Sequence, residues 1–356
     1  MNMNLGCLLL SLIGLVNLAL GSPGDWLDEF IDCRESCEII RSCSDPSTDA
    51  PDHHNGFDLS YFDETPVFLR KCLLWDCESD CDYQCQQIVT ILRIENGEEI
   101  YQFHGKWPFK RMFGIQELYS TLFSIANFVP HYRGFKILRS ELKKLSHYDK
   151  SGILLDKYVY VSIAGMLAWT ASSIFHLRDF IVTEKLDYFF AGATVLSGFH
   201  AIFIRIFRLD KHDNLRHLFC GTVILIFLMH ILRLYLDWSY TYNMRFNVAF
   251  GVLQYLLLLT LSYRNYVHLK SQPKSRSSPY ASQAQMTWQL CTVPLLLVVG
   301  TSLAMSCELF DFFSYTWQID SHAIWHACTI LPSWKLYDFF IRDYRYLKHR
   351  CNSLAE

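Results

Sequence analysis

Seven apolar stretches of membrane-spanning length follow one another from residue 112 onward, and they constrain the fold more than any other feature. An α-helix needs about 20 apolar residues to cross a bilayer. A single stretch also suits a buried helix of a soluble protein, but seven in series favour a membrane protein. The first and last carry the most polar groups. They run approximately over residues 112–131, 158–177, 186–207, 215–236, 246–263, 288–309 and 319–341.

The basic residues of the connecting loops indicate which side of the membrane each loop faces. The loops after the second, fourth and sixth stretches are poor in Lys and Arg. Cytoplasmic loops carry an excess of Lys and Arg. We therefore expect a cytosolic C-terminus and a lumenal N-terminus. The basic residues cluster after the first, third, fifth and seventh stretches, at Arg133, Lys136, Arg139, Lys143, Lys144, Lys150, Arg208, Lys211, Arg216, Arg264, Lys270, Lys274, Arg276, Arg342, Arg345, Lys348 and Arg350.

The first 22 residues are typical of a secretory signal peptide. The segment from Leu5 to Leu20 is apolar, and Ala19, Gly21 and Ser22 are small residues that suit cleavage. The segment before it has no positive charge, so an uncleaved membrane anchor is the alternative. A signal peptide places the following residues in the lumen, in agreement with the loop charges.

A cysteine-rich region follows the signal peptide. An oxidising compartment favours disulfides over zinc, which is the competing interpretation of such spacings. Seven cysteines leave one thiol unpaired, and the pairing cannot be read from the sequence. The cysteines are Cys33, Cys37, Cys43, Cys72, Cys77, Cys81 and Cys85.

These patterns predict an all-α membrane protein with seven transmembrane helices and an N-terminal disulfide-rich lumenal domain. We divide the chain into a signal peptide (1–22), a cysteine-rich lumenal domain (23–110), a seven-transmembrane domain (111–342) and a cytosolic tail (343–356). A formal net charge of −3 gives no indication of nucleic-acid binding. Membrane lipids are the expected surroundings.

Polar residues at one depth of this bundle suggest a metal site. His322 and His326 lie four residues apart and therefore share a helix face, and His176 ends another apolar stretch. The predicted topology places all of them at the lumenal ends of their helices, together with Ser172 and Asp187. Three imidazoles and an open position form the ligand set of a catalytic zinc. Packing and hydrogen bonding between helices are the alternative roles of such a histidine pair.

The first apolar stretch carries a second set of polar residues. Glu117, Ser120, Ser124 and Asn127 lie at spacings of three and four, with Glu117 toward the lumen. They could support the metal ligands from behind, or form a cation site such as a structural calcium near Glu117. A polar seam between helices explains them equally well.

The residues also resemble a known family. The segments GKWPF (105–109), SSIFHLRDFIVTEKLDYFFA (172–191) and HAIWHACTILPSWKLYDFF (322–340), with the cysteine-rich region, are similar to the post-GPI-attachment-to-proteins factor three family, also called Per-one-like. That family belongs to the CREST superfamily of seven-span hydrolases, with alkaline ceramidases and adiponectin-type receptors. Its pattern matches Ser172, His176, Asp187, His322 and His326.

The resemblance implies removal of the sn-2 acyl chain from GPI-anchored proteins, a phospholipase A2 type of reaction, in the Golgi or ER membrane. It implies that Asp187 acts as general base or holds the water, and that Ser172 donates a hydrogen bond to the water or the oxyanion. A covalent seryl intermediate is the less favoured role. It also implies a six-cysteine pattern to which Cys72 is an addition, so that Cys72 is the candidate for the unpaired thiol.

Two other functions compete with this one. An alkaline ceramidase-like lipid amidase would use the same metal chemistry on a ceramide-like lipid. A non-enzymatic seven-span receptor or escort would hold a structural zinc with a closed fourth position. The cysteine-rich region favours the first function, because a small lipid needs no lumenal domain to meet a protein cargo.

Overall fold

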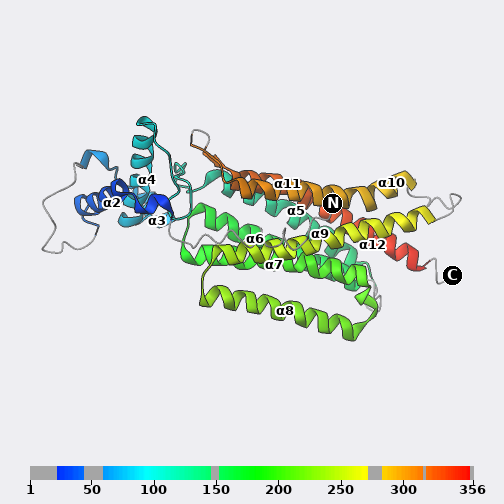
Figure 1. Cartoon of the computed structure of the whole chain (residues 1–356). Coiled ribbons are helices and arrows are strands. Elements are labelled where there is room, and N and C mark those ends of the chain that lie inside the picture. The colour runs from blue at the N-terminus through cyan, green and yellow to red at the C-terminus, as the bar shows by residue number, and fades with distance from the viewer. Residues whose placement is uncertain (1–21, 44–58, 146–151, 272–282, 316–317, 353–356) are drawn as a thin grey trace, which may run out of the picture. The chain divides into compact units, whose positions relative to one another are not determined.

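The computed structural model describes residues 22–43, 59–145, 152–271, 283–315 and 318–352, which are mostly helical (Figure 1). The expected signal peptide therefore lies outside the described residues, apart from Ser22. The chain divides into two compact units, residues 1–110 and 111–356. Each unit is described by itself.

The first unit is built on two helices joined by three disulfides. Its elements are η1 (Pro23–Trp26), α2 (Asp28–Ile40), η2 (Leu59–Tyr61), α3 (Val67–Leu73) and α4 (Cys77–Glu95). The disulfides are Cys33–Cys85, Cys37–Cys81 and Cys43–Cys77. Cys33 and Cys37 on α2, and the three cysteines of α4, follow at intervals of four and share a helix face, so two disulfides join the helices directly. The third ties Cys43, just beyond the end of α2, to the start of α4. Six of the seven cysteines are therefore in disulfides and do not form the alternative zinc site. Cys72 is the free thiol, and it is exposed.

A small core surrounds these disulfides. Phe30, Val89 and Phe103 are almost fully buried beside the disulfides. The buried carboxylate of Asp80 accepts hydrogen bonds from Arg41 and Gln84, each at 2.7 Å, so its charge is paired. A unit of this size has little apolar core, and the cross-links compensate by restricting the unfolded chain.

The second unit contains five helices long and apolar enough to cross a membrane. In the described residues these are α6 (Gly152–Leu177), α7 (Ile181–Phe207), α8 (Asp213–Leu236), α9 (Tyr240–Ser271) and the continuous stretch Gln283–Glu308. That stretch comprises α10 (Gln283–Thr287), the π-helical turn η4 (Trp288–Thr292) and most of α11 (Val293–Phe310). The helix η3 (Leu209–Lys211) connects α7 to α8.

We expected seven membrane spans, but by length and apolar composition five helices of the described residues qualify. The two other long helices, α5 (Leu118–Lys143) and α12 (Ser321–Asn352), do not meet this criterion. The physical reason is that both carry polar residues turned into the protein. On α5 the buried residues include Ser120, Ser124 and Asn127.

The start of the first expected stretch is also corrected. Residues 112–117 are not helical, because a tight turn pairs Met112 with Ile115 and places Phe113 and Gly114 at positive φ. The helix begins only at Leu118. At the other end of the unit, α12 continues into residues that we assigned to the tail.

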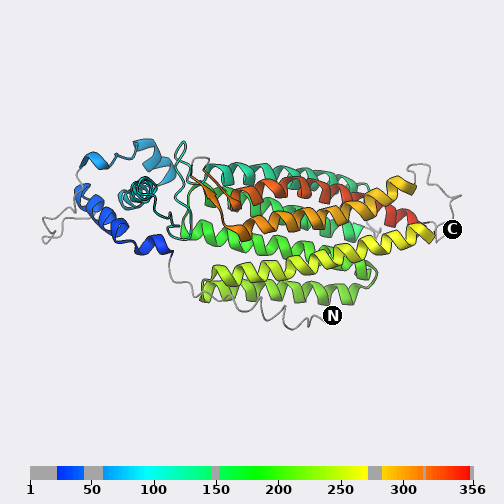
Figure 2. The same ribbon diagram turned by 45° about the horizontal axis from the view of Figure 1, so that its top comes forward.

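The long helices run alongside one another in both views (Figure 2). Helix α5 packs on α6 and α12, α6 on α7, α7 on α9, and α12 on α11. A short antiparallel hairpin, β1 (Phe313–Ser314) and β2 (Ile319–Asp320), connects α11 to α12. The hairpin turns the chain back, so the end of α11 lies beside the start of α12.

His104 of the first unit provides a pH test of this architecture. Its Nε2 lies 2.8 Å from Asp82 Oδ1, and this hydrogen bond raises the pKa of His104 above its usual value, although partial burial opposes the shift. The protonated ring therefore stabilises the folded unit fully below the unfolded pKa of about 6.5. The stabilisation is lost as pH rises through the folded-state pKa.

We expect the first unit of the full chain to resist proteolysis better at pH 6 than at pH 8, and His104→Gln to reduce this difference. The effect is small because His104 is about half exposed. The measurement is the rate of limited proteolysis at both pH values. An unchanged pH difference in the variant would show that another group is responsible.

Candidate metal centre

The three predicted histidines lie together. His176 comes from the last turn of α6, and His322 and His326 come from the first two turns of α12. Each offers a ring nitrogen, and these atoms lie within 4.8 Å of one another. His176 and His326 are almost fully buried, at 2% and 1% exposure. Such a spacing of nitrogen donors allows one metal ion to contact all three.

Each imidazole is oriented by a partner at its Nδ1 atom. His176 Nδ1 lies 2.7 Å from Glu117 Oε2, and His322 Nδ1 lies 2.7 Å from Glu308 Oε2. His326 Nδ1 lies 2.9 Å from the Ser124 hydroxyl. Histidines that bind metals commonly donate their other ring N–H to such a partner, which fixes the tautomer and the ring plane. The Nε2 atoms are therefore the nitrogens suited to bind a metal.

Local backbone contacts place Glu117 beside His176. The Glu117 N–H donates to the His176 carbonyl at 3.0 Å, and the Gln116 N–H donates to the Leu177 carbonyl at 3.1 Å. The start of α5 is thus joined to the end of α6. Residues 116 and 117 belong to the first apolar stretch but precede α5, because their N–H groups bond to the end of α6 and Glu117 contacts His176.

The hairpin and its flanking residues place His322 beside Glu308. The Ser321 N–H donates to the Phe312 carbonyl at 2.9 Å across the hairpin. Asp320 Oδ1 accepts from the Ala323 N–H at 2.8 Å. A side-chain acceptor at this position satisfies one of the N–H groups that a helix start leaves unpaired. Helix α12 therefore begins with a defined direction for His322.

His326 is held through its backbone as well as its ring. Asn127 Nδ2 donates to the His326 carbonyl at 2.7 Å, and the Thr329 hydroxyl donates to the same carbonyl at 2.8 Å. Two of the three polar residues expected to support the site from the first stretch, Ser124 and Asn127, thus contact His326. The third, Glu117, contacts His176.

Ser172 lies in the same cluster. It is buried on α6, one turn before His176, and its Oγ atom is 3.0 Å from Ser124 Oγ. The hydroxyls of Ser172 and Ser124 and the ring of His326 therefore form a continuous series of hydrogen-bond contacts. Asp187 is half-buried in the second turn of α7, and its catalytic role stays a prediction.

Glu308 is a site residue that the sequence analysis missed. It is the only charged residue between 288 and 309, and a charged side chain inside an apolar span is a functional candidate by default. That signal could have identified it. Its partner could not be inferred, because the hairpin that brings Glu308 to His322 has no clear sequence signature.

The site chemistry fits a divalent cation. The Glu117 carboxylate is buried and that of Glu308 is mostly buried, each faces an imidazole nitrogen, and Asp320 is buried two residues before His322. Buried charge is costly unless it is compensated, and a dication on three imidazoles would compensate it. Among the described residues, the other group of candidate ligands is Cys43, Cys77 and Cys81, which are all in disulfides. A calcium ion at Glu117 gains no support.

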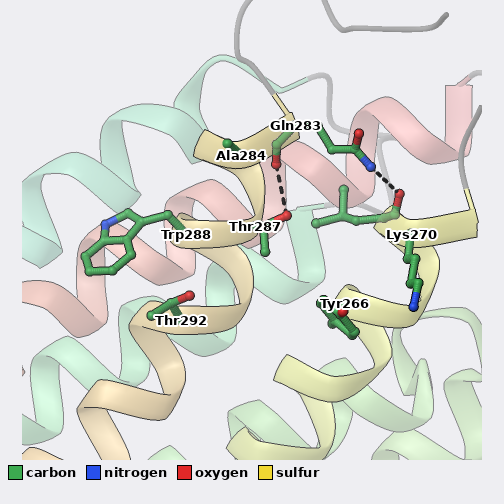
Figure 3. Close-up of a pocket in the computed structure, with 8 residues that line it drawn as sticks. Tyr266, Lys270, Gln283, Ala284, Thr287, Trp288 and Thr292 are labelled. Atoms are coloured by element: carbon green, nitrogen blue, oxygen red, sulfur yellow. Dashed lines mark hydrogen bonds between the residues drawn. The ribbon is translucent and has the colours of Figure 1, made fainter. Parts of the chain in front are cut away.

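A cavity of about 530 Å³ lies elsewhere, between the end of α9 and the start of the α10–α11 stretch (Figure 3). Along that stretch, Trp288 and Glu308 are separated by 20 residues, or roughly 30 Å of helix. The cavity is therefore remote from the histidines. It is lined by Tyr266, Leu269, Lys270, Gln283, Ala284, Thr287, Trp288 and Thr292.

Comparison with known proteins gives a consistent family. Residues 67–344 match the model of the Per1-like family. Protein PER1 of Saccharomyces cerevisiae is 56% identical over 92% of this chain and 94% of its own length. The GPI-specific phospholipase A2-like PGAP3 of Cricetulus griseus is 33% identical over 94% of this chain and 93% of its own. Post-GPI attachment to proteins factor 3 of Drosophila melanogaster is 32% identical over 92% and 90%. No solved structure matches the chain.

The two carboxylates should control metal affinity. We expect Glu117→Gln and Glu308→Gln each to weaken zinc binding by about 10- to 100-fold, because the amide holds the imidazole less firmly. Competition with a chromophoric chelator on the purified full chain measures this. Glu141→Gln, at the other end of α5, is the matched control. Equal zinc affinity in all variants would show that the carboxylates do not act through the histidines.

Proposed function

The chain belongs to the Per1-like family, and from this premise we propose that it is a GPI-specific phospholipase A2. In this function it removes the sn-2 acyl chain of GPI-anchored proteins during lipid remodelling. The names of its animal relatives, which include GPI-specific phospholipase A2-like, support the reaction class. The relatedness extends over more than nine tenths of both chains in these matches, so it includes both units.

The observation that carries the proposal is the set of three clustered imidazoles, each with its own orienting partner. His176, His322 and His326 would hold zinc through Nε2. Such a zinc ion supplies a Lewis acid and a bound water whose pKa is near 7. Glu117 and Glu308 keep two of the rings in place. This is a hydrolytic arrangement, because a nucleophile becomes available at neutral pH.

The direction of the hydrogen bonds gives Ser172 its role. If His326 uses Nε2 as a ligand, its Nδ1 carries the proton and donates to Ser124. The Ser124 hydroxyl then donates to Ser172, which leaves the Ser172 hydroxyl proton for the substrate. Ser172 thus donates to the oxyanion that develops on the ester carbonyl. Asp187 would act as the general base or hold the water.

The proposed function requires a particular topology. Helices α5 and α12 complete a bundle of seven spans, with their polar faces covered by neighbouring helices. We propose that the first unit and the histidines face the lumen of the ER or Golgi and that the C-terminus faces the cytosol, and the distribution of basic residues in the loops supports this topology. GPI-anchored proteins present their lipid on that side. The disulfides of the first unit are compatible with an oxidising lumen.

His326 provides the direct test of function. In cells that lack the endogenous activity, we expect the parent chain to restore lyso-GPI and remodelled chains, and His326→Ala to restore neither, because a ligand is lost. Mass spectrometry of GPI lipids and ceramides measures this. His230→Ala, which removes a buried histidine of α8, is the control. Restoration by His326→Ala would refute a metal hydrolase, and a change in ceramides alone would favour the amidase.

Ser172→Ala distinguishes the two roles of the serine. Loss of one oxyanion donor lowers kcat by about 10²- to 10³-fold, so we expect a measurable residual rate with unchanged zinc affinity. Kinetics of the purified chain on a GPI substrate provide the measurement. A complete loss of turnover, together with a trapped acyl-enzyme in the parent, would instead identify Ser172 as a nucleophile.

A further inference from the structure

A buried series of contacts connects His326 to a fourth histidine outside the metal centre. The Trp169 ring on α6 meets the His326 ring edge to face, with centroids 5.1 Å apart and planes at 84°. Trp169 Nε1 donates to His131 Nε2 on α5 at 3.1 Å. His131 Nδ1 in turn lies 2.6 Å from the Tyr337 hydroxyl on α12. Three helices thus meet around His131.

These contacts define the protonation of His131. The indole N–H is a donor only, so Nε2 of His131 must accept. A neutral imidazole then carries its proton on Nδ1 and donates it to the Tyr337 hydroxyl. Both ring nitrogens are therefore satisfied, and the ring is fixed at two points. His131 is 5% exposed and Tyr337 is fully buried.

The packing around His131 leaves the ring no room to move toward α6. A Cβ atom added to Gly165 of α6 would lie 1.9 Å from His131 Nδ1. The ring therefore lies directly against the α6 backbone, four residues before Trp169. His131 of α5 therefore contacts α6 at two points, the backbone of Gly165 and the indole of Trp169.

His326 needs this support more than the other two ligands do. His176 and His322 are each oriented by a carboxylate at 2.7 Å, whereas the partner of His326 Nδ1 is the Ser124 hydroxyl at 2.9 Å. A hydroxyl can rotate, and this one also contacts Ser172. A hydrogen bond to a charged acceptor is roughly twice as strong as a neutral one. His326 is therefore the one ring of the three that no carboxylate of the described residues orients.

We propose that His131 is a positioning residue for the metal centre. It fixes the Trp169 indole, and the indole holds the His326 ring in the plane that directs Nε2 toward His176 and His322. The indole orients the His326 ring by packing against it, whereas the other two rings are oriented by a hydrogen bond to a carboxylate. Trp169 also contacts Trp325, which borders both His322 and His326. This inference rests on the proposed function, because it concerns the same site.

Four variants of the full chain test the role. His131→Leu removes both polar contacts, whereas His131→Gln retains one acceptor for Trp169 and one donor for Tyr337. Gly165→Ala forces the His131 ring to move without touching the metal centre. His230→Leu removes another buried histidine, which stacks on Phe246 of α9, and serves as the control. The measurements are zinc affinity by chelator competition, the visible spectrum of the cobalt(II)-substituted chain, kcat and KM on a GPI substrate, and Tm.

For His131→Leu and Gly165→Ala we expect zinc affinity and kcat to fall by about tenfold or more, with an altered cobalt spectrum. His131→Gln should remain within about threefold of the parent, since its hydrogen bonds persist. His230→Leu should leave zinc affinity, the cobalt spectrum and kcat unchanged, because within the described residues both ring nitrogens of His230 are buried without a hydrogen-bond partner and it contacts none of the three histidines.

Two results would overturn the inference while the proposed function stands. One is zinc affinity, spectrum and kcat in His131→Leu equal to those of an active parent. The other is a loss in every variant, His230→Leu included, that follows Tm. An active parent that shows no dependence on zinc, or a parent that is inactive, would instead refute the proposed function, and the inference would fall with it.

Discussion

The structure of the second unit depends on the requirement that polar groups on helices in an apolar surrounding find partners within the protein. Glu117 at the N-terminal cap of α5 is buried, as are Ser124 and Asn127 on the helix itself, and each contacts a histidine from another helix. These contacts join α5 to α6 and α12. The same interactions that satisfy the polar groups therefore also build the candidate metal centre, so stability and the proposed function share the same hydrogen bonds.

A second buried polar contact holds the helices at a different level of the unit. Arg205 of α7 and Asp343 of α12 form a two-point ion pair, and Asn265 of α9 donates to the same carboxylate at 3.2 Å. A bidentate arginine–carboxylate pair fixes both distance and orientation. It lies near the end of α12 opposite to His322, so that helix is held at both ends. A ligand pair on α12 can then keep a constant position relative to α6.

Much of this could be predicted from the sequence where the pattern is local. The spacing of four between His322 and His326, and between cysteines of α2 and α4, reports a shared helix face directly. The contacts of Glu308 could not be predicted in this way, because they depend on a hairpin whose two strands have only two residues each. Hydropathy also under-represents α5 and α12. Their inward polar residues lower the average although the helices pack in the same bundle.

The choice of a hydroxyl as the partner of His326 has a consequence for the proposed reaction. A carboxylate at position 124 would orient the ring more firmly, but it accepts protons only and could not donate to Ser172. The Ser172 proton would then turn toward the carboxylate and away from the substrate. Ser124 keeps the direction of donation at the cost of a weaker hold on the ring. The Trp169 indole, fixed by His131, compensates for that weaker hold without altering the proton arrangement. The packing around His131 is therefore what allows one histidine to serve both as a metal ligand and as the start of the hydroxyl series.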